Sequence, residues 1–314
     1  MTDRIVITCV QMQECFDLFR DTFVQHGVEV ALPPLLSQQF TEAELTDLLR
    51  GMDGIIAGDD PLSRPVIFAA DRLRVIAKWG IGTDGIDFAA ATERGIKVSN
   101  TPSVFGDAVA DVAMGYVLIL ARQLHRIHAS ILDGQWLKHR GEVLAGQTLG
   151  TAGFGDIGRS VAARAHGFGM NVIAHDIAAG ATDAAARLGV ELVGQAELFV
   201  RSAYLVLCAP LTPETRHMIN RDTLALMSSG SYVVNVSRGS LVDEVALVEA
   251  LDSGQIAAAG LDVFEEEPLP AGSPLRRFPQ CVFGSHNGSN TRLAAERASE
   301  KAVANLLRDL GYTA

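Results

Sequence analysis

The chain has 314 residues, of which 48% are hydrophobic and 20% are charged, so it is long enough for two domains that each bury a core. Its formal net charge of −11, with no basic run to offset it, argues against non-specific nucleic-acid binding. The longest apolar run, 112–121, is too short to span a bilayer and predicts a buried helix. We therefore expect neither a nucleic-acid partner nor a membrane partner.

Cysteine usage and the start of the chain indicate a reducing compartment. The cysteines are Cys9, Cys15, Cys208 and Cys281, and no two of them have the CxxC spacing. We interpret them as reduced thiols. The chain enters the strand-like IVITCV without a basic region and cleavage site, so we expect no signal peptide and a cytoplasmic protein.

The first hundred residues alternate short apolar runs with helical spacing. Apolar runs at 5–10, 54–58 and 74–79 predict strands. Helical spacing over 15–26, and a serine followed by proline within 63–65, predict helices between them. Strands that alternate with helices are typical of a parallel sheet covered by helices.

One long helical pattern, 104–132, follows this first system. Its middle is apolar nearly all round, so we expect it to be buried on more than one side. A connector between domains and a dimer contact both fit that pattern. His125 and His128 are spaced i, i+3 on it, but no third ligand has a telling spacing, which favours a polar helix face over a metal site.

The segment 147–176 has the strand–turn–helix–strand pattern that holds a dinucleotide pyrophosphate. Gly153 permits the tight turn, Gly155 lets the backbone approach the phosphates, and Gly158 lets the helix pack closely on the strand. The phosphates then meet backbone N–H groups at the positive end of the helix dipole. Asp176 can accept hydrogen bonds from the adenosine ribose hydroxyls and would repel a 2′-phosphate, which favours NAD over NADP.

Polar residues follow the later strand-like runs. These runs are 204–209, 231–236, 257–263 and 281–283. The polar residues at or just past strand ends are Arg238, Asp262, Glu267 and His286. Because ligands of open parallel sheets bind at the carboxyl ends of strands, this placement predicts one shared site.

Three of these residues suit a nicotinamide reaction on an alcohol or a carbonyl. His286 is the natural acid/base, because histidine changes its charge near neutral pH. Glu267 can hold the imidazole in one tautomer, and Arg238 offers a fork that matches a carboxylate. Each also has a structural interpretation: Arg238 in an ion pair, Glu267 in a solvated acidic run, His286 as a satisfied loop histidine. Their placement together beside a dinucleotide site favours the functional interpretation.

The chain resembles the D-isomer-specific 2-hydroxyacid dehydrogenase family, and within it the short phosphoglycerate-dehydrogenase-like members. The matching segments are KWGIGTDGID (78–87), NTPSVFGDAVAD (100–111), LGTAGFGDIGRS (149–160), CAPLTPETRHMI (208–219), VVNVSRGSLVDEVAL (233–247), GLDVFEEEP (260–268) and GSHNGSNT (284–291). They cover the chain nearly end to end, in the family's order and spacing. As in the short members, we expect no regulatory domain.

The resemblance implies a fold and a reaction. The fold is α/β, with two doubly wound parallel-sheet domains of Rossmann or flavodoxin type and an active-site cleft between them. Residues 1–99 and 288–314 would form the substrate domain, and 100–287 the NAD-binding Rossmann domain. The reaction is hydride transfer between NAD and a small D-2-hydroxy acid or 2-oxo acid, with 3-phosphoglycerate among the candidates. The family also implies a homodimer to which the long helix contributes.

The resemblance assigns roles to particular residues. The catalytic trio falls on Arg238, Glu267 and His286, with Glu267 chosen as the acid immediately before proline. The substrate carboxylate would be bound by Arg238 and by backbone N–H groups of the loop at Ile81 and Gly82. The implied cofactor contacts are Gly153, Phe154, Gly155, Asp156, Ile157, Gly158, Asp176, Pro210, Thr215 and Asp262. No metal is implied.

Several positions depart from the family pattern. Gly284 and Ser285 stand where the family usually has Thr-Pro before the histidine. Phe105 replaces a frequent asparagine, and Thr151 with Ala152 replaces bulky aliphatic residues in the first nucleotide-binding strand. A buried threonine needs a hydrogen-bond partner, and the sequence names none.

Other interpretations remain open at this stage. A non-catalytic NAD-sensing scaffold, as in the family's corepressor branch, would keep the dinucleotide site, but the complete trio argues against it. An NADPH-preferring glyoxylate/hydroxypyruvate reductase is a second alternative, and Asp176 argues against it. Lys78, next to the substrate loop, fits either attraction of an anionic substrate or a solvated lysine.

Overall fold

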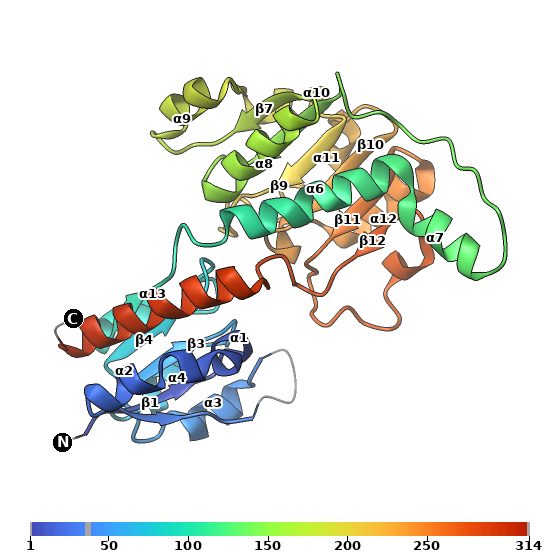
Figure 1. The fold of residues 1–314 in the computed structure, drawn as a ribbon. Coiled ribbons are helices and arrows are strands. Elements are labelled where there is room, and N and C mark those ends of the chain that lie inside the picture. Colours follow the sequence, from blue (N-terminus) through green and yellow to red (C-terminus); the bar gives the residue numbers. More distant parts are fainter. Residues whose placement is uncertain (1, 35–38, 313–314) are drawn as a thin grey trace. The chain divides into compact units, whose positions relative to one another are not determined.

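The computed structural model describes residues 2–34 and 39–312. The chain divides into two compact units (Figure 1). Unit 1 comprises Met1–Val104 and Asn290–Ala314, and unit 2 comprises Phe105–Ser289. The two ends of the chain therefore belong to the same unit. The assignment of the units as substrate and NAD-binding domains, with a cleft between them, stays a prediction.

Unit 1 is built on a parallel sheet of five strands in the order β2-β1-β3-β4-β5. The strands are β1 (Arg4–Ile7), β2 (Glu29–Ala31), β3 (Gly54–Ala57), β4 (Val75–Lys78) and β5 (Lys97–Ser99). Both central strands, β3 and β4, are buried at every position, as expected for a sheet covered on both faces. This order is the flavodoxin-like doubly wound order, whose switch point lies between β1 and β3.

The helices of unit 1 come from both ends of the chain. They are α1 (Val10–Glu14), the 3-10 turn η1 (Phe16–Leu18), α2 (Arg20–Gln25), α3 (Glu42–Leu48), α4 (Arg64–Ala69), α5 (Phe88–Glu93) and α13 (Arg292–Leu310). The predicted helix 15–26 is therefore wrong in its bounds, because α1, η1 and α2 replace it. Residues of α13 contact β3 and β4, so the last helix completes the core of the first unit.

Unit 2 is built on a parallel sheet of seven strands in the order β12-β11-β10-β9-β6-β7-β8. The strands are β6 (Thr148–Ala152), β7 (Asn171–His175), β8 (Glu191–Leu192), β9 (Tyr204–Leu207), β10 (Ser231–Asn235), β11 (Ile256–Leu261) and β12 (Val282–Phe283). Its first six strands in chain order have the doubly wound Rossmann order, which confirms the predicted fold class. The switch point lies between β6 and β9.

The helices of unit 2 lie before its first strand, β6, or between its successive strands. They are α6 (Gly106–Arg122), α7 (Leu124–Leu132), α8 (Asp156–Gly167), α9 (Ala181–Leu188), α10 (Gln195–Arg201), α11 (Arg221–Leu226), α12 (Glu244–Ser253) and the 3-10 turns η2 (Gly239–Leu241) and η3 (Pro274–Arg277). None of the described helices is long and apolar enough to cross a membrane.

The long helical pattern at 104–132 forms two helices, so the prediction of one helix is wrong. Gln123, with φ +50°, has the left-handed conformation and separates α6 from α7. Helix α6 packs against α8, β10 and β11, which explains why its middle is apolar nearly all round (Figure 1). Helix α7 instead leaves large apolar side chains exposed, and Trp136 beyond it is 80% exposed.

Candidate active site

The glycine-rich turn lies at the switch point of the unit 2 sheet. Gly153 has φ +96°, and a Cβ there would lie 2.6 Å from the backbone nitrogen of Ala209, which follows β9. A Cβ on Gly158 would lie 2.2 Å from the Gly153 carbonyl oxygen. Gly155 has no heavy atom within 4 Å of an ideal Cβ, so this part of the turn is open. Two glycines thus permit close packing, and the third leaves room for a ligand to approach the backbone.

Asp176, just beyond β7, is tied to that turn. Its Oδ2 accepts a hydrogen bond from the backbone N–H of Phe154 at 2.6 Å, and its Oδ1 accepts one from Ala178 at 2.7 Å. The carboxylate is half-buried, and each of its oxygens has a second acceptor position. It can therefore accept hydrogen bonds from ribose hydroxyls while it holds the turn.

Three other residues of the turn have different surroundings. Phe154 is 2% exposed, so its side chain belongs to the core and only its backbone is suited to a ligand. Asp156 begins α8, and its carboxylate accepts a hydrogen bond from the backbone N–H of Gly106 at 3.0 Å, which ties α8 to the start of α6. Ile157 is half-buried. Their cofactor contacts stay predictions.

The loop after β9 is folded back on itself by a threonine. The Thr215 hydroxyl donates to the Pro210 carbonyl at 2.7 Å and accepts from the backbone N–H of Thr212 at 2.8 Å. Because β9 neighbours β6, this loop and the glycine-rich turn lie on the two sides of the switch point. The family resemblance implies that Pro210 and Thr215 contact the cofactor, and these contacts stay a prediction.

His286 and Glu267 form a hydrogen-bonded pair. The imidazole Nδ1 lies 2.7 Å from Glu267 Oε2, and the two side chains are 21% and 23% exposed. Glu267 Oε1 accepts the backbone N–H of Phe264 at 2.9 Å, which fixes the carboxylate from its other side. A carboxylate held in this way favours the tautomer with the proton on Nδ1 and can stabilise the imidazolium.

Two glutamates of the acidic run 265–267, Glu265 and Glu267, contact different histidines. Glu265, not Glu267, faces a second histidine, with 2.6 Å between its Oε1 and Nε2 of His217. The backbone N–H of Glu265 donates to Glu244 at 2.8 Å, and burial raises the pKa of the Glu244 carboxyl. The acid directly before proline is therefore the one that contacts His286. No pattern in the sequence predicted the pair of His217 and Glu265, because the two residues lie far apart along the chain.

Arg238 lies at the end of β10, in a tightly held loop. Its carbonyl accepts a hydrogen bond from the Asn235 amide at 2.8 Å, and its guanidinium donates to the Ser237 carbonyl at 3.1 Å. A Cβ on the next residue, Gly239, would lie 1.8 Å from the carbonyl carbon of Phe264. The loop that carries Arg238 thus lies directly on the loop that leads to Glu267.

Asp262 holds the loop that carries His286. Its carbonyl accepts the backbone N–H of His286 at 2.7 Å, and its Oδ2 accepts that of Gly288 at 2.8 Å. Its Oδ1 accepts the Tyr116 hydroxyl at 3.1 Å, and the residue is only 2% exposed. Both carboxylate oxygens are therefore engaged within the protein. The predicted contact of Asp262 with the cofactor stays a prediction.

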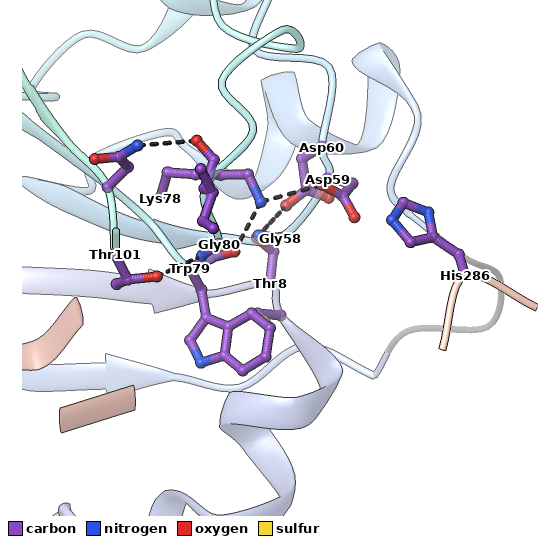
Figure 2. A network of polar contacts seen from close by, with 12 residues as sticks. Thr8, Gly58, Asp59, Asp60, Lys78, Trp79, Gly80, Thr101 and His286 are labelled. Atoms are coloured by element: carbon purple, nitrogen blue, oxygen red, sulfur yellow. Dashed lines mark hydrogen bonds and ion pairs between the residues drawn. The ribbon is translucent and has the colours of Figure 1, made fainter. Parts of the chain in front are cut away.

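The predicted substrate loop belongs to unit 1, where residues 100–101 hold it. The Thr101 hydroxyl accepts the backbone N–H of Gly80 at 2.9 Å, and the Asn100 amide donates to the Ile81 carbonyl at 2.9 Å (Figure 2). The side chain of Ile81 is 37% exposed, and Gly82 is half-buried. The loop is thus ordered by its own unit, and its contact with a substrate carboxylate stays a prediction.

Lys78 is buried, so its interpretation as a solvated lysine is wrong. It is 5% exposed, and its Nζ donates to the Trp79 carbonyl at 2.7 Å and lies 3.1 Å from Asp59 Oδ1 (Figure 2). The neighbouring Asp60 accepts a short hydrogen bond from the Thr8 hydroxyl. Burial raises the pKa of the Asp60 carboxyl. Attraction of a substrate by Lys78 stays a prediction.

Two further predictions concern a metal site at His125 and a hydrogen-bond partner for Thr151. Within residues 2–34 and 39–312, no group of three or more His, Cys, Asp and Glu side chains is placed to hold a metal ion. His125 instead lies with Nε2 2.9 Å from the Pro279 carbonyl. The Thr151 hydroxyl is buried, and among the described residues it has no hydrogen-bond partner.

The first comparison with known proteins concerns unit 2, where a protein-family profile matches most of the residues. A family profile described as "D-isomer specific 2-hydroxyacid dehydrogenase, NAD binding domain" matches residues 114–288, more than half of the chain. These residues include the glycine-rich turn, Asp176 and the His286–Glu267 pair.

Relatives extend the similarity to most of the chain. A D-3-phosphoglycerate dehydrogenase of Methanocaldococcus jannaschii is 41% identical over 85% of this chain, but the match spans only 51% of that protein. A hydroxypyruvate reductase of Thermotoga maritima is 40% identical over 88% of this chain and 90% of that protein. The solved structure of an Aquifex aeolicus D-lactate dehydrogenase, in complex with NAD and lactic acid, has a TM-score of 0.84 at 26% identity. That match covers 96% of this chain and 93% of the other.

Proposed function

From the premise that this chain belongs to the D-isomer specific 2-hydroxyacid dehydrogenase family, we propose that Arg238, Glu267 and His286 act on a small D-2-hydroxy acid or 2-oxo acid. Members of this family are NAD-dependent oxidoreductases acting on CH–OH groups, and so is this chain. The observation that carries the proposal is the His286–Glu267 hydrogen bond of 2.7 Å, in the same unit as the glycine-rich turn. An acid/base pair beside a dinucleotide site is what hydride transfer to or from a carbonyl requires.

His286 moves the proton. Because Nδ1 of His286 is hydrogen-bonded to Glu267, the ring nitrogen that exchanges a proton with the substrate is Nε2. In the oxidation direction Nε2 removes the hydroxyl proton, and the Glu267 carboxylate stabilises the imidazolium that results. In reduction the same imidazolium returns the proton to the carbonyl oxygen. NAD, when bound, supplies the hydride acceptor for oxidation and, as NADH, the donor for reduction.

Arg238 and the turn position the reactants. A planar guanidinium binds a carboxylate through two parallel hydrogen bonds, so Arg238 can fix the substrate's acid group. Backbone N–H groups of Ile81 and Gly82 are proposed to bind the same carboxylate. The backbone at 153–158 is proposed to hold the pyrophosphate, and Asp176 the adenosine ribose in preference to a 2′-phosphorylated ribose.

The candidate substrates of this proposal share one reactive group and differ in the side group attached to it. Hydroxypyruvate, glyoxylate, pyruvate and 3-phosphohydroxypyruvate all carry the 2-oxo acid group that the trio would act on.

A homodimer is proposed because α7 and the segment after it expose several large apolar side chains, including Leu132 at 73% and Val143 at 70%. A cytoplasmic location also stays a prediction.

The experiment that tests the proposal compares His286→Ala and Arg238→Ala with the unaltered chain, using NADH and a panel of 2-oxo acids. General acid–base catalysis contributes about 10²–10⁴ in rate, so we expect His286→Ala to lose at least about 100-fold in kcat/KM. Arg238→Ala should lose a similar factor, chiefly through a higher KM.

His217→Ala is the matched control, because His217 also pairs with a glutamate, at 2.6 Å, in the same unit. We expect His217→Ala to keep kcat/KM within about threefold. An exposed pair contributes little to stability, and His217 is not part of the proposed trio. Undiminished turnover by His286→Ala contradicts the proposed roles. If the unaltered chain binds NADH but turns over none of the panel, the scaffold alternative is correct instead.

A further inference from the structure

Tyr116, in the middle of α6, lies against two glycines of the neighbouring sheet. A Cβ on Gly260, in β11, would lie 2.8 Å from the Tyr116 Cβ. A Cβ on Gly284, just after β12, would lie 2.2 Å from the Tyr116 hydroxyl oxygen. The tyrosine is 8% exposed, and the space that it fills exists because both positions lack side chains.

The Tyr116 hydroxyl is hydrogen-bonded to an aspartate that holds the loop of His286. It donates to Asp262 Oδ1 at 3.1 Å. Asp262 in turn accepts the backbone N–H of His286 on its carbonyl, at 2.7 Å, and that of Gly288 on Oδ2, at 2.8 Å. One aspartate therefore holds the loop 284–288 at two points, and the tyrosine fixes the orientation of that aspartate's side chain.

His286 has a backbone conformation that needs such support. Its φ of +54° lies in the left-handed region, which non-glycine residues adopt only at a cost. The residue keeps this conformation because its surroundings hold it. A looser loop would let φ relax and would move the imidazole away from Glu267, since the side chain rotates with the backbone.

We propose that Tyr116 is a positioning residue for the reaction, acting through Asp262 to hold the loop 284–288 and so to keep His286 against Glu267. The same geometry makes Gly284 obligatory, because a Cβ there would also lie 2.1 Å from Asp262 Oδ1. This inference rests on the proposed acid/base role of His286.

Tyr116 is suited to this role because it stays a donor. Burial, and then the charge of Asp262, raise the pKa of the Tyr116 hydroxyl, so it remains protonated throughout the pH range of an enzyme assay. Removing this hydroxyl leaves a buried carboxylate oxygen without the donor that now satisfies it. A buried acceptor without its donor is costly, so we expect the Asp262 side chain to hold Gly288 less firmly.

The first experiment is Tyr116→Phe, which keeps the ring and removes only the hydroxyl. We expect kcat to fall about tenfold, the size typical of disturbed catalytic geometry, with the KM for the 2-oxo acid within about threefold. Hydrogen exchange gives a readout that does not depend on turnover. The backbone N–H groups of His286 and Gly288 should exchange at least about tenfold faster, because local opening becomes easier.

The backbone N–H of Ala246 is the internal control for exchange, because another aspartate, Asp243, holds it in the same unit at 3.1 Å. Its exchange rate should not change. If Ala246 accelerates equally, Tyr116 has only a general structural role and the inference is overturned. Unchanged kcat together with unchanged exchange at His286 and Gly288 also overturns it.

A second experiment obstructs the same contact from Gly284. Gly284→Ala adds a Cβ 2.2 Å from the Tyr116 hydroxyl oxygen and 2.1 Å from Asp262 Oδ1, so we expect it to separate the two groups and to lower kcat at least about tenfold. Once the two groups are separated, loss of the hydroxyl has no further effect. We therefore expect Tyr116→Phe/Gly284→Ala to be no slower than Gly284→Ala alone.

A double variant whose loss in kcat equals the product of the two single losses would overturn the inference, because the hydroxyl would then act independently of the contact at Gly284 and Asp262. His286→Ala, measured beside them, separates this result from a failure of the proposed function. If His286→Ala keeps its turnover, the acid/base assignment fails. If His286→Ala is inactive while Tyr116→Phe is normal in both kcat and exchange, only the role of Tyr116 fails.

Discussion

Units 1 and 2 share one plan, a parallel sheet wound outward from a switch point, but the strand ends at the switch points differ. In unit 1 the polar side chains there bind one another: Thr8 after β1 bonds to Asp60 after β3, and Lys78 at the end of β4 pairs with Asp59. In unit 2 the turn after β6 is open at Gly155. The same architecture brings loops together at one edge in both units. The two edges differ in that side chains bind one another at the first, as Lys78 and Asp59 do, whereas part of the backbone is left open at the second, at Gly155.

The strongest test of this comparison replaces two glycines of one turn. Gly153→Ala places a Cβ 2.6 Å from backbone at a φ of +96°, so we expect it to destabilise unit 2 by about 3 kcal/mol or more. Gly155→Ala meets open space and should change the free energy of unfolding by less than about 1 kcal/mol while it weakens NADH binding. Thermal unfolding and fluorescence titration with NADH measure the two effects. Equal melting temperatures would contradict the packing argument for Gly153.

Next in size is the removal of the buried charge in unit 1. Lys78→Met removes the ammonium that donates to the Trp79 carbonyl and lies 3.1 Å from Asp59 Oδ1. We expect a loss of about 1–3 kcal/mol of stability, at the lower part of the range for buried pairs because Asp59 is 41% exposed. Arg50→Met is the matched control, because Arg50 pairs with Asp47 on the surface and should matter by about 0.5 kcal/mol or less. Denaturant unfolding measures both variants.

Kinetics of the same Lys78→Met variant decide between a structural and a substrate role. A KM for 2-oxo acids within about threefold of the unaltered chain would support the purely structural contrast between the units. A large increase in KM would mean that the Lys78 ammonium also serves the substrate, beside the proposed backbone groups of Ile81 and Gly82, and its purely structural role would be wrong.

The smallest expected effect concerns cofactor choice in unit 2. Asp176→Ala removes the carboxylate that would repel a 2′-phosphate, so the NADH to NADPH ratio of kcat/KM should fall about tenfold, or 1.4 kcal/mol. Part of this change reflects the turn, because Asp176 also accepts the Phe154 N–H. A ratio that does not change would show that Asp176 does not contact the ribose. An unaltered chain that prefers NADPH would favour the reductase alternative.

Much of unit 2 could be predicted because its signals are local or follow from parallel topology. The glycine pattern 153–158 specifies a turn by residue type alone. Arg238 and His286 could be placed at one edge because successive parallel strands end on the same side of the sheet. The choice of Glu267 within the acidic run came from its position before proline, and the hydrogen bond to His286 agrees with that choice.

What could not be predicted depends on contacts between distant segments. The break at Gln123 carries no glycine or proline signal, so periodicity continued through it. The hydrogen bond from Tyr116 to Asp262 joins residues 146 apart, and the sequence showed Tyr116 only as part of an apolar helix face. Lys78 was ambiguous because burial of its ammonium depends on Asp59, whose position beside β4 follows from the strand order β1-β3-β4.

The way unit 1 is assembled has a consequence for synthesis of the chain. Trp79 donates to Ser299 at 3.0 Å, and Asn305 donates to the Asn100 carbonyl at 2.9 Å, so α13 is part of the core that the first hundred residues begin. On a ribosome, the unit that starts first must therefore wait for the last helix, while unit 2 can fold as soon as residue 289 emerges. Until then the apolar face of β3 and β4 that α13 covers has no partner, so the first core to begin is the second to be completed.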